Sequence, residues 1–155
     1  MEREVVIKSC VLFKDWSKAD ITALAKNSSE HVLLAGQSVF YEGEAPKSLY
    51  VIESGTAVIK KANKSGDDTK VANFNKGNHF GELGILDQQK RSASVEMSES
   101  GEILEIPYSA IHEIIAKIPQ SGVLFYKELA LTLATRISKT NEDLASFRSL
   151  RLRSV

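Results

Sequence analysis

The pattern of apolar and polar positions divides the chain into three parts, of which the first is helical. Within residues 1–28, the stretch Trp16–Asp20 has the composition of a helix start, with a serine and an aspartate ahead of an apolar run. Ile21, Leu24 and Ala25 follow at the spacing of one helix face. This part of the chain is therefore predicted to form short N-terminal helices.

Residues 29–107 show the pattern of short β-strands. Runs rich in Val, Ile, Phe and Tyr are separated by glycines at roughly even intervals, which is typical of an all-β roll or sandwich. The polar segment 63–68 is predicted to be a solvated turn, and Glu53–Thr56 to be a tight hairpin. The predicted strands cover residues 31–35, 38–42, 48–54, 56–62, 69–75, 78–80, 91–98 and 102–106.

From Pro107 onward the apolar period lengthens to that of helices. Ile111, Ile114, Ile115 and Ile118 predict one helix, which Pro119 should end. A second, longer helix is predicted from about residue 122 to about residue 150. Along it, mostly apolar residues recur at alternating steps of four and three, close to a heptad repeat, with one threonine among them: Tyr126, Ala130, Leu133, Ile137, Thr140, Leu144 and Phe147.

These patterns predict a mainly β fold with flanking helices. The expectation is an eight-stranded antiparallel β-roll (a double-stranded β-helix, or jelly roll) with N-terminal helices and a long C-terminal helix. A length of 155 residues suits one domain spanning residues 1–155. Its parts would be the helices of residues 1–28, the roll of residues 29–107 and the helices of residues 108–150.

Composition narrows the class of protein. Twenty basic residues balance twenty acidic ones, so the strong positive surplus usual in duplex-binding proteins is absent. Cys10 is the only cysteine, which excludes an intrachain disulfide and fits a small buried apolar residue in a reducing compartment. No apolar run is long enough to span a bilayer, and residues 1–20 do not resemble a secretory signal. We therefore expect a cytoplasmic protein without a membrane partner.

The segment 77–86 interrupts the strands and contains two closely spaced glycines, Gly81 and Gly84. Such glycines let backbone approach a ligand, and a short helix starting near Gly81 would offer unpaired N–H groups to an anion. An ordinary glycine-containing turn is the alternative that this pattern alone leaves open.

Arg91 precedes an alternating run in which Ala93, Val95 and Met97 share one face. The same alternation places Arg91 on this inward face, where a guanidinium needs an anionic partner and matches the geometry of a phosphate. The alternative is an exposed Arg91, or one paired with Asp87.

Glu82 is the carboxylate nearest to this candidate anion site. A carboxylate repels phosphate, but it is a good acceptor for a sugar hydroxyl. One hydroxyl acceptor, one arginine and free backbone N–H groups together indicate a site for a ribose cyclic phosphate.

The segment Gly81–Val95 resembles the phosphate-binding cassette of the cyclic nucleotide-binding domain family, to which the catabolite activator protein and the regulatory subunits of cAMP-dependent kinase belong. The resemblance extends from about Leu12 to about Leu150, and the cassette covers residues 80–95. Lys90 departs from kinase-type cassettes, which usually have a proline before the arginine. The resemblance implies a regulatory binding domain and not an enzyme.

Site residues follow from the resemblance position by position. Glu82 would accept from the ribose 2′-hydroxyl, and Arg91 would pair with the phosphate. The backbone of Gly81, Leu83 and Gly84 would close over the same group, next to Ser92 and Ala93. The expected ligand is cAMP, with cGMP the alternative because Ser92 occurs with either base.

The long C-terminal helix resembles the dimer helix of the activator-type members. In that resemblance Thr140 and Asn141 lie where the adenine is contacted, and the helix would form a homodimer. The alternative is that the helix packs on its own β-roll, with Thr140 bonding its own backbone. The chain ends before the position of a helix–turn–helix region, so direct DNA binding is not expected.

Two other functions compete with the sensor hypothesis, in which nucleotide occupancy is coupled to the C-terminal helix. One is an interaction or scaffold domain with the same fold that binds no nucleotide. The other is a metal-dependent jelly-roll enzyme, for which the histidines are His31, His79 and His112. Because His79 and Glu82 are the one close pair and metal sites normally need three ligands, no metal is expected.

Overall fold

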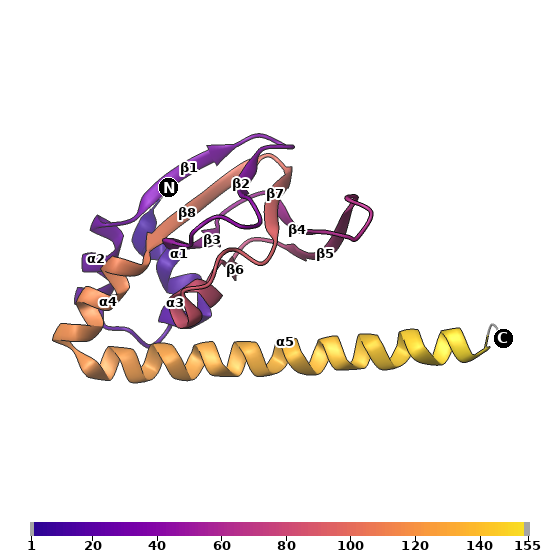
Figure 1. Cartoon of the computed structure of the whole chain (residues 1–155). Coiled ribbons are helices and arrows are strands. Elements are labelled where there is room, and N and C mark those ends of the chain that lie inside the picture. The colour runs from indigo at the N-terminus through magenta and orange to yellow at the C-terminus, as the bar shows by residue number, and fades with distance from the viewer. Residues whose placement is uncertain (1, 154–155) are drawn as a thin grey trace.

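The computed structural model describes residues 2–153, within which eight strands form two four-stranded antiparallel sheets (Figure 1). The predicted antiparallel β-roll is therefore confirmed. One sheet has the order β1-β8-β3-β6 and the other the order β2-β7-β4-β5. The strands are β1 (Ser29–Leu33), β2 (Ser38–Phe40), β3 (Ser48–Ile52), β4 (Thr56–Ala62), β5 (Asp68–Phe74), β6 (His79–Phe80), β7 (Ser94–Glu99) and β8 (Gly101–Pro107).

The turn between β3 and β4 changes sheets, so the prediction of a tight hairpin at Glu53–Thr56 is wrong. β3 pairs with β6 and β8, whereas β4 pairs with β5 and β7. Gly55 makes the turn possible: it has a φ of +81°, and a Cβ there would lie 2.7 Å from the carbonyl oxygen of Ser100. The segment 63–68, in contrast, closes the β4–β5 hairpin and is exposed, as predicted.

The side chains of β3 explain how the roll is filled. Every residue of β3 is buried, and alternate residues face opposite ways. Tyr50 and Ile52 join the aromatic core between the two sheets, whereas Leu49 and Val51 join a second core under the helices. β3 thus contributes side chains both to the interior of the roll and to the core shared with the helices.

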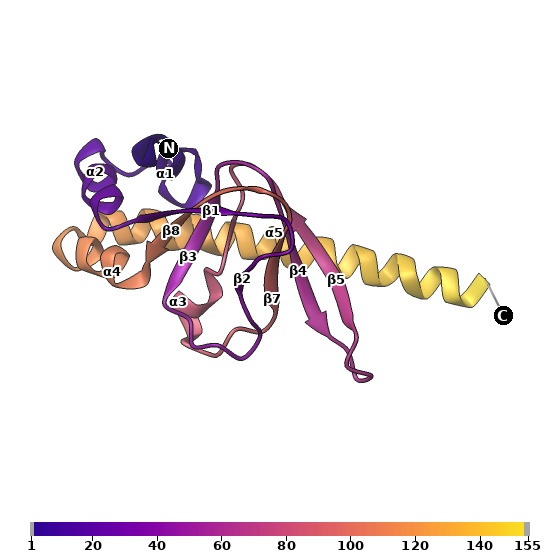
Figure 2. The same cartoon turned by 90° about the horizontal axis from the view of Figure 1, so that it is seen from above.

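The N-terminal helices and the helix that follows β8 gather at one end of the roll (Figures 1 and 2). Ser17 caps its helix by accepting from the backbone N–H of Asp20 at 3.1 Å, and the predicted stripe of Ile21, Leu24 and Ala25 is buried. The elements outside the strands are α1 (Arg3–Ser9), the 3-10 turn η1 (Val11–Phe13), α2 (Lys18–Lys26), α3 (Leu83–Asp87), α4 (Tyr108–Lys117) and α5 (Pro119–Arg153).

The first turns of α5 are fixed to the N-terminal helices. The Trp16 indole N–H donates to the carbonyl oxygen of Ser121 at 3.0 Å, and the Ser121 hydroxyl donates to Asp20 at 2.8 Å. From there α5 runs beside the roll, and its last turns extend beyond it (Figures 1 and 2). Despite its 35 residues, α5 is too polar to be a membrane span, and no other helix within residues 2–153 qualifies.

Candidate functional site

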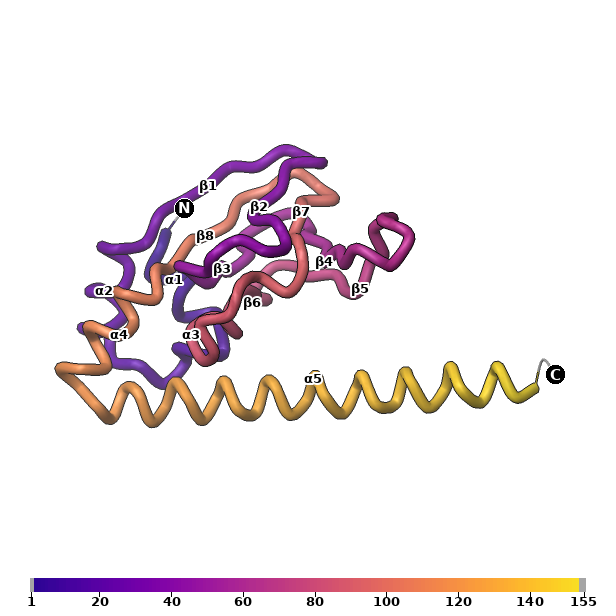
Figure 3. The backbone as a smooth tube through the Cα atoms, viewed as in Figure 1, coloured from indigo at the N-terminus to yellow at the C-terminus, as the bar shows by residue number. Residues whose placement is uncertain are grey.

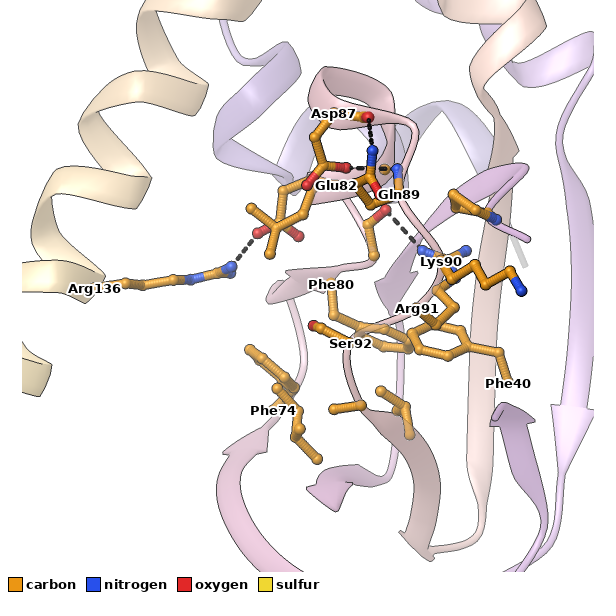
Figure 4. A pocket seen from close by; sticks show the side chains of 17 residues that line it. Phe40, Phe74, Phe80, Glu82, Asp87, Gln89, Lys90, Arg91, Ser92 and Arg136 are labelled. Atoms are coloured by element: carbon orange, nitrogen blue, oxygen red, sulfur yellow. Dashed lines mark hydrogen bonds and ion pairs between the residues drawn. The ribbon is translucent and has the colours of Figure 1, made fainter. Parts of the chain in front are cut away.

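The segment between β6 and β7 forms one wall of a cavity of about 180 Å³, here called the cassette cavity (Figure 4). The chain leaves β6, turns through α3 and returns toward β7, as the tube in Figure 3 shows. Phe40, Phe74 and Phe80 supply its apolar side. The predicted site residues that line it are Gly81, Glu82, Leu83, Gly84, Arg91, Ser92 and Ala93.

Glycines make the tight path of this segment possible. Gly81 has a φ of +80°, and a Cβ there would lie 2.9 Å from Nη1 of Arg91. At Gly84 a Cβ would lie 2.5 Å from Pro46 and 2.6 Å from the Tyr108 hydroxyl. The two glycines that the sequence singled out therefore permit close packing of backbone around the arginine.

Arg91 is buried, with 9% of its surface exposed. It precedes β7 instead of lying in it, because its backbone N–H and C=O bond to Glu44 and Gly43. Its Nη1 donates to the carbonyl oxygen of Gly81 at 3.0 Å and to the Tyr108 hydroxyl at 3.2 Å, and its Nη2 donates to the carbonyl oxygen of Ser48 at 2.7 Å. Phe40 packs against the guanidinium face at 4.0 Å.

These contacts leave the charge of Arg91 unneutralised. Its partners are two carbonyls and a phenol, and no ion pair joins it to Asp87 or another carboxylate within residues 2–153. A guanidinium has five N–H donors, and these three bonds use two on Nη1 and one on Nη2. Two N–H groups, the one on Nε and one of the two on Nη2, therefore have no acceptor in the described structure, and Nε and Nη2 are the pair of atoms through which a guanidinium binds a phosphate bidentately.

Glu82 lies on the same cavity and is 1% exposed. One of its carboxylate oxygens accepts from Nη1 of Arg136, a residue of α5, and Figure 4 shows this side chain reaching across from the helix. Nη2 of Arg136 donates to the backbone carbonyl of His79 at 3.1 Å. The other carboxylate oxygen, Oε2, is buried without a hydrogen-bond partner in the described structure.

His79 has the second unpartnered buried atom, Nε2, in the part of the chain that the structure describes. Its side chain is buried, and loss of solvation lowers the pKa of the imidazole below its usual value of 6.5. The residue is therefore a neutral imidazole next to the Glu82–Arg136 ion pair. Within residues 2–153 no cluster of three or more His, Cys, Asp and Glu side chains is placed to hold a metal ion.

A second and larger cavity, of about 840 Å³, lies between α5 and the sheet and is here called the helix cavity. It adjoins the cassette cavity, because Ile59, Phe74 and Arg136 line both. Thr140 lines the helix cavity, but its hydroxyl donates to the backbone carbonyl of Arg136 at 2.9 Å. Asn141 is exposed and lines neither cavity.

The structure adds two polar residues that sequence reasoning missed, Arg136 and Tyr108. Arg136 lies one helical turn before Thr140, so the spacing that singled out Thr140 also contained a signal for Arg136. No comparable signal exists for Tyr108, which arrives from the first turn of α4. Together the site presents a cationic edge and a free carboxylate oxygen in one cavity, a combination suited to a small anion that also carries a hydroxyl group.

Comparison with known proteins identifies a matching family and several relatives. The model of the cyclic nucleotide-binding domain family matches residues 30–118. The cyclic AMP receptor protein of Thermus thermophilus is 27% identical over 149 residues, covering 95% of this chain and 67% of that protein. Cyclic GMP-binding protein C of Dictyostelium discoideum is 30% identical over 123 residues, covering 78% of this chain and 5% of that protein.

The solved structures include a close match in architecture. The crystal structure of the Thermus thermophilus catabolite activator protein aligns with a TM-score of 0.72 at 26% identity, covering 86% of this chain and 61% of that one. The chain thus spans about two thirds of the length of these bacterial relatives. With more than half of its residues matched by the family model, the chain belongs to the cyclic nucleotide-binding domain family.

Proposed function

We propose that this domain binds cAMP as a regulatory sensor and couples occupancy to α5. The observation that carries the proposal is the pairing, in one cavity, of an unneutralised Arg91 edge with the unpartnered Oε2 of Glu82. The cyclic phosphate would occupy the arginine edge, and the ribose 2′-hydroxyl would donate to Oε2. Both groups are buried, so each interaction would form in a poorly solvated site and would be correspondingly strong.

The base would extend into the helix cavity, which adjoins the cassette cavity and contains Thr140. The Arg136 guanidinium packs over the Phe74 ring at 5.6 Å, so an aromatic ring and a cation flank the passage between the two cavities. Planar purines suit such walls. Ser92 and Ala93 line the part of the cassette cavity where the phosphate would lie. Asn141 is exposed, so it could contact the base only if the α5 helix of a second copy brought its own Asn141 to this cavity.

Coupling to α5 would run through Glu82. Because one carboxylate oxygen is held by Arg136 of α5 and the other would accept the sugar hydroxyl, ligand and helix share one buried side chain. Binding that alters the position of this carboxylate changes its ion pair with the helix. Ligand occupancy and helix position would then be linked thermodynamically.

Titration calorimetry tests the ligand assignment. Wild-type protein should bind cAMP, with cGMP as the competing ligand and the non-cyclic 5′-AMP as the control. Arg91→Lys keeps the positive charge but loses the paired N–H donors of the guanidinium, and we expect it to weaken binding by roughly 2–4 kcal/mol. Equal affinity of wild type and this variant for cAMP would contradict the phosphate assignment.

A ligand series tests the Glu82 assignment separately. 2′-Deoxy-cAMP lacks the hydroxyl that Oε2 would accept, so wild type should bind it more weakly than cAMP. Glu82→Ala leaves no side-chain acceptor for the hydroxyl, so it should remove most of this preference while still binding both ligands. Absence of binding to any cyclic nucleotide at millimolar concentration would favour the scaffold alternative, in which the three internal bonds of Arg91 are its only role.

A further inference from the structure

The hydroxyl group of Tyr108 joins the beginning of the cassette to its arginine. It donates to the carbonyl oxygen of Gly81 and accepts from Nη1 of Arg91 at 3.2 Å. Gly81 also accepts from the same Nη1 at 3.0 Å, so phenol, carbonyl and guanidinium form a closed triangle. This triangle occupies the side of the guanidinium opposite to the Nε–Nη2 edge.

Tyr108 is itself held firmly. It is 8% exposed, and its backbone N–H donates to the carbonyl oxygen of Lys47 at 2.9 Å, just before β3. The absence of a side chain at Gly84 leaves room for its hydroxyl, from which a Cβ there would be 2.6 Å away. Burial raises the pKa of this phenol, so it remains a protonated donor at neutral pH.

A free arginine side chain has many rotamers, and holding it in one orientation before the ligand arrives reduces the entropy that binding must overcome. Ser48 restrains Nη2 of Arg91, but only Tyr108 and Gly81 restrain Nη1. We propose that Tyr108 is a positioning residue, whose hydroxyl holds the Arg91 guanidinium so that its Nε–Nη2 edge faces the cassette cavity. The proposal rests on the proposed function, since the group that this edge would bind is the cyclic phosphate.

Tyr108→Phe is the direct test, because the ring that packs in the core is kept and only the hydroxyl is lost. Nη1 of Arg91 then loses one acceptor, and we expect cAMP affinity to fall about tenfold. Tyr50→Phe is the matched control: its hydroxyl is also in the roll, but it bonds Glu105 at 3.4 Å and not the arginine. Titration calorimetry should show wild-type affinity for this control within about twofold.

A double-mutant cycle distinguishes positioning from a general structural effect. If Tyr108 acts by orienting the Arg91 guanidinium, Tyr108→Phe should change the affinity for cAMP little in the Arg91→Lys background. Equal losses in both backgrounds, or no loss in either, would overturn the proposal. Failure of the wild type to bind any cyclic nucleotide would instead reject the proposed function.

A measurement without ligand completes the test. The Nε–H resonance of Arg91 in a ¹⁵N spectrum of the free protein should shift and broaden in Tyr108→Phe, because the guanidinium gains rotational freedom. It should be unchanged in Tyr50→Phe. An Arg91 signal that is identical in wild type and Tyr108→Phe would refute positioning, whether or not a nucleotide binds.

Discussion

Glu82 and Arg136, 54 residues apart in the sequence, form an ion pair that connects the cassette to α5. The two ends of this pair differ in their surroundings. The Glu82 side chain is 2% exposed and that of Arg136 is 38% exposed. Without the ion pair, Arg136 could still be solvated by water, whereas the buried Glu82 carboxylate would lose its cationic partner. The pair should therefore contribute to the stability of the fold and, under the proposed function, to the response to ligand.

Removing the arginine should expose this dependence. Arg136→Gln leaves a buried carboxylate without its cationic partner, and we expect the free energy of unfolding to fall by roughly 1–3 kcal/mol in urea titrations. The control is Lys117→Gln, which breaks an exposed pair with Glu113 on α4 and should cost at most about 0.5 kcal/mol. Adding Glu82→Gln to Arg136→Gln should restore part of the loss. A double variant less stable than either single one would contradict this account.

The buried imidazole of His79 predicts how stability depends on pH. Its pKa is lowered by desolvation, so between that value and 6.5 the unfolded chain binds more protons than the folded one. Stability should therefore be fully present above about pH 6.5 and should fall as the pH drops below it. Urea titrations from pH 8 to pH 5 should show a shallower decline for His79→Gln. The same change at the exposed His112 controls for the loss of a histidine, and an unchanged slope in His79→Gln would count against this assignment.

The extent of the roll was predictable because its signals are local. Glycine spacing and β-prone runs located all eight strands, and only their boundaries shifted by a few residues. The hairpin at Glu53–Thr56 was mispredicted because the same local pattern suits a hairpin or a turn between sheets. The choice between the two is decided by the pairing of β3 with β8, about fifty residues further along the chain. A local sequence pattern contains no information on such a distant pairing.

The residues of the candidate site also fall into a group that local sequence patterns identify and a group that they do not. The residues from Gly81 to Ala93 are continuous in sequence, and the structure brings them to one cavity. Tyr108 and Arg136 join them only because α4 and α5 pack at particular angles, set by contacts such as that between Trp16 and Ser121. Sequence periodicity identifies the helix, but it does not show which turn of the helix lies next to which part of the roll.

Cys10 provides a probe of unfolding. The thiol is fully buried, and burial raises its pKa to about 12, so almost none of it is thiolate at neutral pH. In the native protein it should react with a disulfide reagent such as DTNB only as fast as the chain opens. In urea above the unfolding midpoint the reaction should be complete within the mixing time. Rapid labelling of native protein, at a rate independent of urea, would show that the thiol is accessible.

The far half of α5 predicts self-association. Early in α5, Phe125 and Leu129 are buried in the core with the N-terminal helices, but further along it three members of the heptad-like series, Ile137, Leu144 and Phe147, are 61%, 47% and 59% exposed. A row of exposed apolar residues on one long helix favours pairing with a second copy of the same helix. We therefore expect a dimer in sedimentation equilibrium at micromolar concentration.

Polar substitution within this row should dissociate the dimer. Ile137→Gln with Leu144→Gln removes two of its apolar side chains without touching the roll, so the variant should be a monomer with an unchanged unfolding midpoint at low concentration. Val32→Gln, at a 75% exposed position on β1, should remain a dimer. If α5 instead packs only against the roll of its own chain, wild type and both variants should all sediment as monomers. Because the row begins at Ile137, directly after Arg136, a partner helix placed there would lie close to the Glu82 ion pair, and cAMP should then shift the dimerisation constant.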